Sequence, residues 1–548
     1  MALVVMCLFS PQLSFTQAKA AEQNIEEKQT PTSTSPIKDS GVLLTKVVLS
    51  GSTIYEDEQI EPFISAHIGK RLTPDLAKQI ARSITKMYRR DGFKFSYVQM
   101  PDGAWRTEKG ELLLEALEKS ANDVRIVGAK SVRPELFGEY RNKILQAQPY
   151  NEKLLERYVL LADDLPGNQA NSLYRPRPDI PGATDIVIQM KEEPVWDSWV
   201  RVTNRGSSSI GRYLASLGLN FNSFFGRYER IGATFSTTEK WDALQNLSAY
   251  YQSVLNSEGT TIRLSGNGSR AQTSTTLQEA EINNGRMEFS LSAQHPIIRS
   301  KQKNLTVFGS LTYRDYETKL ADQIAYEDRL RTAKLGVAYL NNRGWQDFGF
   351  QATANATQGL TILNNTDFGS PYHTRSDGRP DFTKLDGELS IWRWFDKSWF
   401  AKASTIGQWS ADSLLASEQF SVGGERYGRA YDSGEITGDH GFAFNLEIQY
   451  DLLKKLREKF QDVETEASWV KKLELLRPYV FYDFGATYGK GRESTSQQTI
   501  ASTGVGLKLK ISEHIIGDFL AAKPLTKAVS SETKGNAFRY FFRITAKF

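Results

Sequence analysis

From Val195 to the end of the 548-residue chain, apolar and polar side chains alternate with a period of two. In one stretch, one face of the predicted strand would carry Leu305, Val307, Gly309, Leu311 and Tyr313, and the other Thr306, Phe308, Ser310, Thr312 and Arg314. Alternating strands of roughly 9 to 11 residues are long enough to cross a bilayer when tilted. The pattern favours a transmembrane β-barrel, and alternation by itself leaves open a large soluble β-sandwich or propeller.

The part of the chain before Val195 has a different pattern, in which short strands accompany amphipathic helices. One helix is predicted to begin with Thr73 as its N-cap and to end at Gly92, because apolar residues recur at spacings of four between them. Strand-like runs follow at 93–100 and 111–117. This order of elements indicates a small α+β module.

The opening of this module is repeated further along the chain. Val47-Val48-Leu49-Ser50-Gly51 is followed by Val124-Arg125-Ile126-Val127-Gly128, and the two glycines are 77 residues apart. In the second copy, Asn151 is the expected N-cap of a helix. The spacing predicts two tandem copies of one module. We therefore assign residues 43–119 to the first copy, 120–195 to the second and 196–548 to the barrel.

The first 42 residues resemble a targeting segment followed by a linker. An apolar stretch from Ala2 to Phe9 precedes Ala18-Lys19-Ala20, which has the small residues that a signal peptidase requires. We expect residues 1–20 to be a signal peptide and the polar, aperiodic residues 21–42 to be a flexible linker. The one cysteine, Cys7, lies in the segment expected to be removed, so the exported chain would contain no disulfide.

The chain ends in a strand with one apolar and one mostly polar face. Tyr540, Phe542 and the terminal Phe548 would face lipid, while residues such as Arg539 and Arg543 would face the lumen. A terminal Phe on such a strand resembles the signal by which bacterial outer-membrane barrels are delivered to the barrel assembly machinery. We therefore expect Phe548, Phe542 and Tyr540 to form this signal. With both barrel ends in the periplasm, the number of strands must be even.

The composition of the chain fits two α+β modules followed by a barrel. Apolar residues make up 40% of the chain, charged residues 24%, and the mean hydropathy is −0.45. No apolar run reaches the roughly 18 to 20 residues of a membrane-spanning helix, whereas alternating barrel strands average to a middling hydropathy. The net charge of +4, spread over the whole chain, does not indicate a nucleic-acid partner.

Catalytic and cofactor motifs are not found in the sequence. The five histidines are scattered without the spacing of a metal site, and neither a P-loop nor a dinucleotide fingerprint occurs. Asp439-His440 imitates part of a hydrolytic dyad but has no nucleophile elbow beside it. We expect no catalytic residues, no metal and no cofactor, and hence not an enzyme.

Two segments of the barrel region carry a specific resemblance. Residues 420–447 and Pro478-Tyr479-Val480-Phe481-Tyr482-Asp483-Phe484-Gly485 resemble the two-partner secretion transporters, the haemolysin secretion/activation family of the outer-membrane superfamily that also includes barrel assembly factors. The resemblance implies two periplasmic polypeptide-transport-associated (POTRA) domains and an all-β transmembrane barrel of roughly 16 antiparallel strands. The tandem α+β modules match the POTRA domains.

The resemblance also implies a latch inside the barrel. In the family an extracellular loop folds into the lumen and presents an arginine to an aspartate on the wall, here Arg429 of Gly428-Arg429-Ala430-Tyr431 and Asp483 of Phe481-x-Asp483-x-Gly485. A buried guanidinium needs a carboxylate to compensate its desolvation. From the residues alone, a solvated Arg429 and a merely pore-lining Asp483 are the alternative. Gly428 and Ala430 stand where the family has Val and Gly.

The function that the resemblance implies is recognition and export of a large exoprotein of haemolysin or adhesin type, which the transporter also activates in some family members. This partner would bind through the POTRA domains in the periplasm, and the barrel would contact outer-membrane lipid. An assembly or insertion factor for other barrels and a passive porin or uptake channel are the alternatives. A charged insertion at 453–476 is predicted to be helical, with Leu456, Phe460 and Val463 on one side.

Overall fold

The structure is a computed structural model. It describes residues 42–101, 105–106, 109–129, 133–177, 184–207, 209–273, 282–342, 348–396, 398–460, 472–491, 497–532 and 535–548. The predicted signal peptide and nearly all of the predicted linker lie outside these ranges. Among the described residues, no helix is long and apolar enough to cross a membrane.

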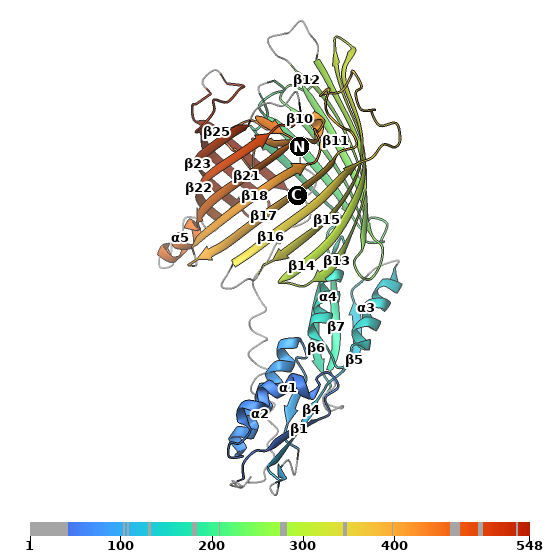
Figure 1. Cartoon of the computed structure of the whole chain (residues 1–548), viewed down its shortest axis with the longest axis vertical. Helices are drawn as coiled ribbons and strands as arrows, with labels where there is room; N and C mark the ends of the chain where they lie inside the picture. The colour runs from blue at the N-terminus through green and yellow to red at the C-terminus, as the bar shows by residue number, and fades with distance from the viewer. Residues whose placement is uncertain are drawn as a thin grey trace. The chain divides into compact units, whose positions relative to one another are not determined.

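The first module is a small sheet packed against helices (Figure 1). Its elements are β1 (Lys46–Ser50), α1 (Asp57–Ile64), α2 (Pro74–Asp91), β2 (Tyr97–Gln99), β3 (Trp105–Arg106) and β4 (Glu111–Leu117). The strand order is β1-β4-β2, with β3 also paired to β4. As predicted, Thr73 caps α2 by accepting a hydrogen bond from Leu76 N at 3.2 Å, and Gly92 ends the helix.

The strand predicted at 93–100 is too long. The chain after Gly92 makes a turn in which Ser96 N donates to Phe93 O at 3.1 Å, so β2 begins only at Tyr97. Phe93 of this turn packs instead onto the module's core, where it lies against the ring of Tyr88.

The second module repeats this plan. Its elements are β5 (Ala121–Val127), α3 (Pro134–Gln146), α4 (Glu152–Asp163), β6 (Asn168–Pro176) and β7 (Thr184–Glu192), and the strand order is β5-β7-β6. Asn151 accepts a hydrogen bond from Lys153 N at 2.9 Å at the start of α4, as expected for its N-cap. In both sheets, the strand that closes the module in sequence lies between the other strands.

The glycines that mark the repeat have the same structural role in both copies. Gly51 has φ +75° and Gly128 has φ +82°, a region that favours glycine. A Cβ atom at Gly51 would lie 2.7 Å from the carbonyl oxygen of Ala116, and one at Gly128 would lie 2.3 Å from that of Met190. Each glycine therefore lets its first strand end directly against the closing strand.

Replacing Gly128 by alanine is expected to destabilise the second module by roughly 1 to 3 kcal/mol, the usual cost of a strained backbone. Urea-dependent proteolysis of the full chain would measure this as a lower midpoint for cleavage within residues 120–195. Gly138→Ala is the matched control, because Gly138 lies in α3 with nothing within 4 Å of its Cβ position. An unchanged midpoint in Gly128→Ala would contradict the close approach.

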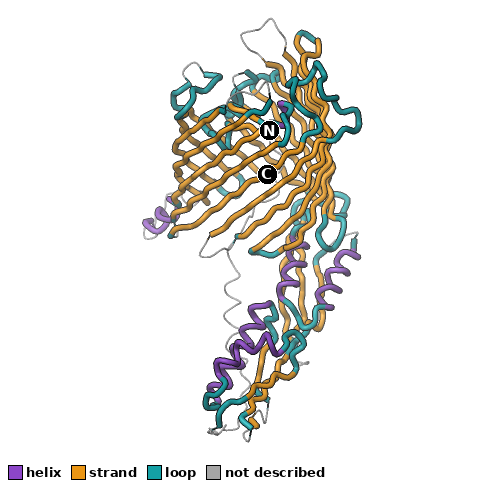
Figure 2. Tube along the Cα trace, viewed as in Figure 1, coloured by secondary structure: helices purple, strands orange, loops and turns teal. Residues whose placement is uncertain are grey.

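Sixteen strands of the described chain close into an antiparallel barrel (Figures 1 and 2). They are β8 (Trp196–Thr203), β9 (Leu214–Asn222), β10 (Glu229–Thr238), β11 (Leu244–Val254), β12 (Thr261–Thr273), β13 (Ile282–Arg299), β14 (Lys303–Leu320), β15 (Gln323–Asn341), β16 (Phe348–Gly359), β17 (Thr383–Phe395), β18 (Trp399–Ser410), β21 (His440–Tyr450), β22 (Leu473–Tyr488), β23 (Gln498–Ile511), β24 (Ile515–Pro524) and β25 (Arg539–Lys547). The predicted fold class and the even strand number are confirmed.

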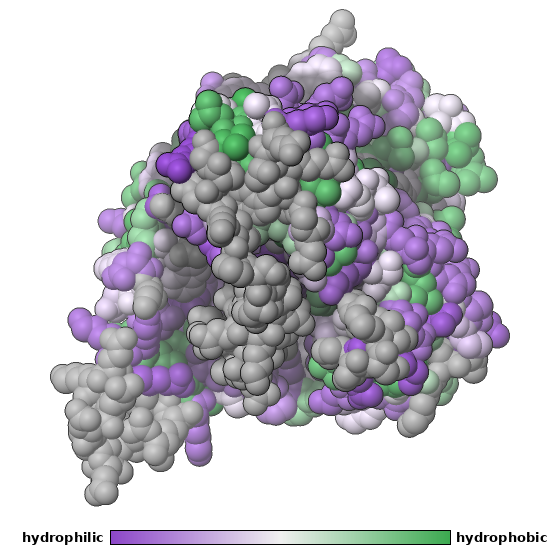
Figure 3. Space-filling model, turned by 90° about the horizontal axis from the view of Figure 1, so that it is seen from below, coloured by the Kyte–Doolittle hydropathy of each residue, from purple (hydrophilic) through white to green (hydrophobic). Residues whose placement is uncertain are grey.

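The period-two pattern sorts side chains between the two faces of the barrel wall. Along β21, Ala443, Asn445 and Glu447 are buried, whereas the intervening Phe442, Phe444, Leu446 and Ile448 are exposed on the outer surface. Hydrophilic and hydrophobic residues are mixed on the face of the molecule seen in Figure 3. Polar inward positions in the strands account for the middling mean hydropathy.

The predicted charged insertion begins as a helix, α5 (Leu452–Phe460), between β21 and β22. Leu453 is buried against Leu473, and Arg477 pairs with Asp451 at 3.1 Å at the base of the helix. The remainder of the insertion up to residue 471, including Val463, lies outside the described residues.

Candidate functional site

The loop between β18 and β21, residues 411–439, contains its own small hairpin. The hairpin is formed by β19 (Phe420–Val422) and β20 (Ile436–Gly438), and a short 3-10 helix precedes it at Ala416–Glu418. Phe420, Val422 and Ile436 are buried in one apolar cluster with Phe481 of the barrel wall. The apolar side chains of the loop therefore pack against the inner face of the barrel.

Arg429, at the tip of this loop, is bound to Asp483 of β22. Its backbone N donates to Asp483 Oδ2 at 2.8 Å, its Nε to both carboxylate oxygens at 3.1 and 3.2 Å, and its Nη2 to Oδ1 at 2.9 Å. Asp483 is 0% and Arg429 6% exposed. The side chain and the main chain of the tip residue are thus held by one carboxylate, which fixes its position and its orientation.

Three further wall residues complete the environment of this pair. Arg429 Nη1 donates to Glu447 Oε2 at 2.6 Å, and its guanidinium lies 3.7 Å from the ring centroid of Phe481. Asn445 Nδ2 donates to Asp483 Oδ1 at 2.6 Å. Glu447 in turn accepts a hydrogen bond from Lys508 of β23. One guanidinium is therefore surrounded by two carboxylates and an aromatic face, which compensate its removal from water.

Two glycines allow the loop to approach the wall closely. Gly428 has φ +85°, and a Cβ atom there would lie 3.0 Å from Ile500 Cδ1. A Cβ atom at Gly485 would lie 2.4 Å from Val422 of the loop hairpin. Ala430 is not among the described residues with positive φ, so alanine at this position carries no backbone strain.

Tyr431 holds the other side of the tip. Its side chain is 1% exposed, and its hydroxyl donates to the carbonyl oxygens of Ala501 at 3.2 Å and Lys527 at 2.9 Å. The structure thus brings together all six residues that the sequence placed at the latch, which are Gly428, Arg429, Tyr431, Phe481, Asp483 and Gly485.

The loop has a second charged attachment, at its root, that sequence reasoning missed. Glu418 ends the 3-10 helix and pairs with Lys384 of β17 at 2.8 Å and with Arg314 of β14. Lys384 Nζ also donates to the Glu418 carbonyl oxygen at 3.0 Å. Burial opposes ionisation of Glu418, but Lys384 and Arg314 outweigh it and hold the pKa of its carboxyl at about 2.

Asp439 connects this loop to two other loops of the barrel. Its carboxylate is fully buried and accepts hydrogen bonds from Arg375 Nη1 at 2.7 Å, Leu414 N at 2.8 Å and Lys490 N at 2.6 Å. The neighbouring His440 Nδ1 accepts from Ser410 N at 3.2 Å. Asp439 is therefore engaged with the Arg375 side chain and with the main chain, and His440 with the main chain.

The residues of the predicted assembly signal lie on the outer surface of the last strand and at its end. Tyr540 is 72% and Phe548 68% exposed, and Phe542 packs against Tyr213 with ring centroids 6.3 Å apart. They are far in sequence from the latch and share no contact with it among the interactions described for these residues.

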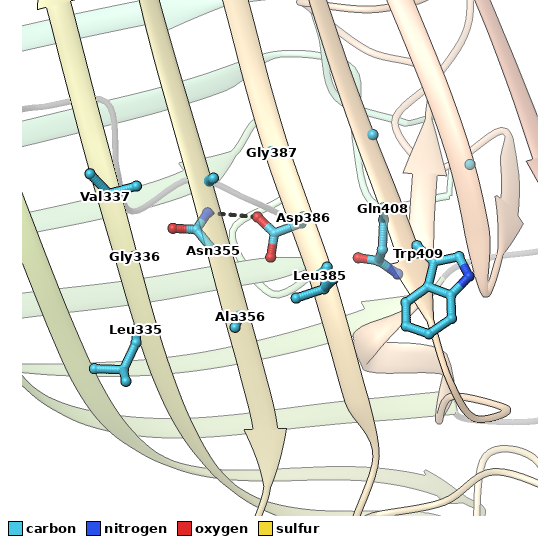
Figure 4. Close-up of a pocket in the computed structure, with 13 residues that line it drawn as sticks. Leu335, Gly336, Val337, Asn355, Ala356, Leu385, Asp386, Gly387, Gln408 and Trp409 are labelled. Carbon is cyan, nitrogen blue, oxygen red and sulfur yellow. Dashed lines mark hydrogen bonds between the residues drawn. The ribbon is translucent and has the colours of Figure 1, made fainter.

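A hollow in the barrel wall is lined by β15 to β18 (Figure 4). Its outer rim carries Leu335 and Trp409, which are 72% and 53% exposed, and a pair inside the wall, Asn355 and Asp386, is hydrogen-bonded at 2.7 Å. Apolar side chains on the outer face suit contact with lipid. The charged groups gather instead around the lumen loop, which we take as the candidate site.

Among the described residues, no group of three or more histidine, cysteine, aspartate or glutamate side chains could hold a metal ion. The acidic residues near the loop are engaged with arginine and lysine. Such pairs join the loop to the barrel wall.

The chain matches one family model over residues 182–509, more than half of its length, and the description of that family is "Haemolysin secretion/activation protein ShlB/FhaC/HecB". The chain belongs to this family. The haemolysin secretion/activation family consists of two-partner secretion transporters, so the protein is an outer-membrane transporter for a large exoprotein partner. Residues 42–118 match a second model, "POTRA domain, ShlB-type".

Relatives of this chain align with it over most of its length. The heme/hemopexin transporter protein HuxB of Haemophilus influenzae strain 86-028NP is 19% identical over 489 residues, which covers 87% of this chain and 82% of HuxB. The structures of CdiB from Escherichia coli and from Acinetobacter baumannii are each 17% identical and each cover 95% of this chain and 94% of their own. Their TM-scores of 0.74 and 0.67 show the same fold.

Proposed function

We propose that the loop 411–439, held by Arg429 on Asp483, keeps the pore in the conformation that is competent for export. The observation that supports this role is the nearly complete burial of Arg429 between Asp483 and Glu447. Such a pair stabilises one loop geometry, since any other position leaves a charge without its partner. The partner would cross the lumen unfolded, and its folding outside the cell would give the transport its direction.

We further propose that the two modules lie in the periplasm and bind the N-terminal secretion domain of the partner as an added strand. The sheet of the second module supports this idea, because β6 (Asn168–Pro176) lies at its edge and, among the residues that the structure describes, pairs only with β7. An edge strand offers unpaired main-chain groups, which bind an extended chain with modest demands on its sequence. Leu173 of β6 is 47% exposed and would lie beside the added strand.

Deleting the gene and comparing secreted proteins tests the transport function. The expected result is the loss of one large exoprotein from the medium, restored when the full chain is supplied again. If the same deletion instead depleted several unrelated outer-membrane barrels, the chain would be acting as an assembly factor. Loss of uptake of a small solute with normal exoprotein secretion would favour the passive channel.

A photo-reactive amino acid at Leu173 of the full chain is expected to cross-link the secretion domain of the partner. The same group at Lys78, an exposed position of α2, is the control and is expected to give little product. Equal cross-linking from both positions would contradict strand addition at β6 and would leave the transport function itself untouched.

The boundaries of the chain's parts follow the changes in its sequence pattern. We propose that residues 1–20 are removed on export, that 21–42 link the first module, and that the modules span 43–119 and 120–195 before the barrel at 196–548. Phe548, Phe542 and Tyr540 would be read by the barrel assembly machinery. The exposure of Tyr540 on the last strand and of Phe548 directly after it supports this role.

A further inference from the structure

The closing seam of the barrel, where β25 meets β8, is paired over a short stretch. The register runs from Arg543 opposite Thr203 to Lys547 opposite Trp199, whereas β9 pairs with β8 along its whole length, Trp196–Thr203. Among the described residues, this seam has the shortest register of the barrel, and one further pair of main-chain bonds joins Ser198 to Phe548. The seam therefore requires support from groups outside the ladder.

Beyond Thr203, one long main-chain bond remains, from Asn204 N to Phe542 O at 3.4 Å, and side chains add to it. Asn204 Nδ2 donates to Tyr540 O at 2.9 Å, and Asn204 Oδ1 accepts from Phe542 N at 2.8 Å. Thr203 Oγ1 donates to Phe542 O at 2.8 Å. The two edges are thus held together up to the point where Arg205 follows β8 and Arg539 begins β25.

These two arginines, one from each edge of the seam, bind consecutive carbonyl groups of the loop tip. Arg205 Nη1 donates to Arg429 O at 2.9 Å, and Arg539 Nη1 donates to Ala430 O at 2.8 Å. Arg539 Nη2 is also paired with Asp432 of the same loop at 2.6 Å. The main chain of the tip therefore bridges the seam.

One aromatic ring contacts both arginines. Phe541 is 7% exposed, and its ring centroid lies 3.9 Å from the guanidinium of Arg205 and 5.0 Å from that of Arg539. A guanidinium over an aromatic face is stabilised and held in plane. Phe541 thereby orients both donors toward the tip.

We propose that Arg205, Phe541 and Arg539 are positioning residues that couple the docked loop to the closed seam. The tip cannot leave the wall without giving up a donor on each edge, and the edges cannot separate there without releasing at least one carbonyl of the tip. By linkage, a change that releases the tip loosens the seam, and a change that loosens the seam releases the tip to the same extent. This coupling adds to the Arg429 latch and needs no partner protein.

Hydrogen–deuterium exchange of the full chain in detergent micelles tests the coupling. In Arg205→Gln combined with Arg539→Gln, amide exchange in the seam segments 198–204 and 539–547 is expected to rise about tenfold, within the roughly 5- to 150-fold range of coupled sites. Asp483→Asn weakens the attachment of the loop tip to β22, away from the seam. It is expected to accelerate amide exchange in the same two segments. Unchanged seam exchange in either variant would overturn the proposal.

Two further variants distinguish coupling at the seam from a general loosening of the barrel. Arg263→Gln removes a guanidinium that lies 3.7 Å from the ring of Tyr250 on another part of the wall, and it is expected to leave the seam unchanged. Phe541→Leu keeps both arginines and an apolar side chain, and it is expected to give a smaller rise than the double variant. A rise with Arg263→Gln equal to that of the double variant would mean general loosening of the barrel and would contradict the coupling.

A disulfide across the seam tests the reverse direction. Arg201 and Thr545 are register partners whose side chains already meet at 3.2 Å, so cysteines at both positions can be oxidised to close the seam covalently. In the Asp483→Asn background, the oxidised seam is expected to slow exchange at the tip, residues 426–432, relative to the reduced form. Identical tip exchange in the two redox forms would contradict reciprocity.

Discussion

Replacement of Arg429 by alanine is expected to lower secretion of the exoprotein at least tenfold, while the amount of barrel in the outer membrane stays near its normal value. The substitution leaves Asp483 buried without the cation that compensates it, while Glu447 keeps its pair with Lys508, and breaking a buried pair costs roughly 3 to 5 kcal/mol. This free-energy cost destabilises the docked loop and not the barrel, because the strand ladders that form the barrel do not involve Arg429. The quantity to measure is secreted partner per unit of transporter in the membrane fraction.

A matched control for this variant lies in the same loop. Arg426 is three residues away, and its side chain is 37% exposed in its pair with Glu388. An exposed pair contributes about 0 to 1 kcal/mol, so Arg426→Ala is expected to secrete at close to the normal rate. Normal secretion by Arg429→Ala would show that the latch has no role in export.

Replacement of Glu418 by alanine is expected to have the second largest effect, a several-fold loss of secretion. Arg314 and Lys384 would be left facing each other without the carboxylate between them, so the root of the loop would lose its ion pairs with β14 and β17 and keep only the bond from Lys384 to the main chain of residue 418. Trypsin cleavage within the loop on intact cells would report this release as faster digestion. Glu425→Ala is the control, since Glu425 and its partner Arg543 are both about two-fifths exposed.

The response of the Glu418 attachment to pH follows from its depressed pKa. The carboxyl has a pKa of about 2 in the folded chain, below the ordinary value of 4.5, so its contribution to stability is fully present above about pH 4.5. That contribution is lost as the pH falls from there toward 2. Loop digestion is therefore expected to stay constant from pH 5 to 8, and an increase within that range would contradict the assigned ionisation.

The barrel could be predicted because lipid and lumen impose opposite polarity on successive residues of each strand. The same physical rule explains why Glu447 could have been found. It lies at an inward position of β21, two residues after Asn445, where a charged side chain in the lumen needs a partner. The family motifs identified Arg429 and Asp483, but period-two alternation alone says nothing about which loop enters the lumen.

The other groups of the site could not be predicted from local pattern. Glu418 lies in an irregular loop and meets residues more than thirty positions away on two different strands, and Asp439 meets the side chain of Arg375 and the main chain of Lys490. Arg205 and Arg539 are brought together only by closure of the barrel. Such contacts depend on the stagger of the strands, which hydrophobic periodicity does not specify.

The short seam also sets the order in which the molecule can be built. β8 begins the barrel in sequence and β25 ends it, so their pairing joins residues more than 300 positions apart and contributes strongly to a high contact order. We therefore expect closure to come late and the loop tip to dock in the same step, because the tip binds a donor on each edge. Until then β8 and β25 are two open edges, each able to pair with a foreign strand. Assembly must shield both edges for as long as the loop takes to dock.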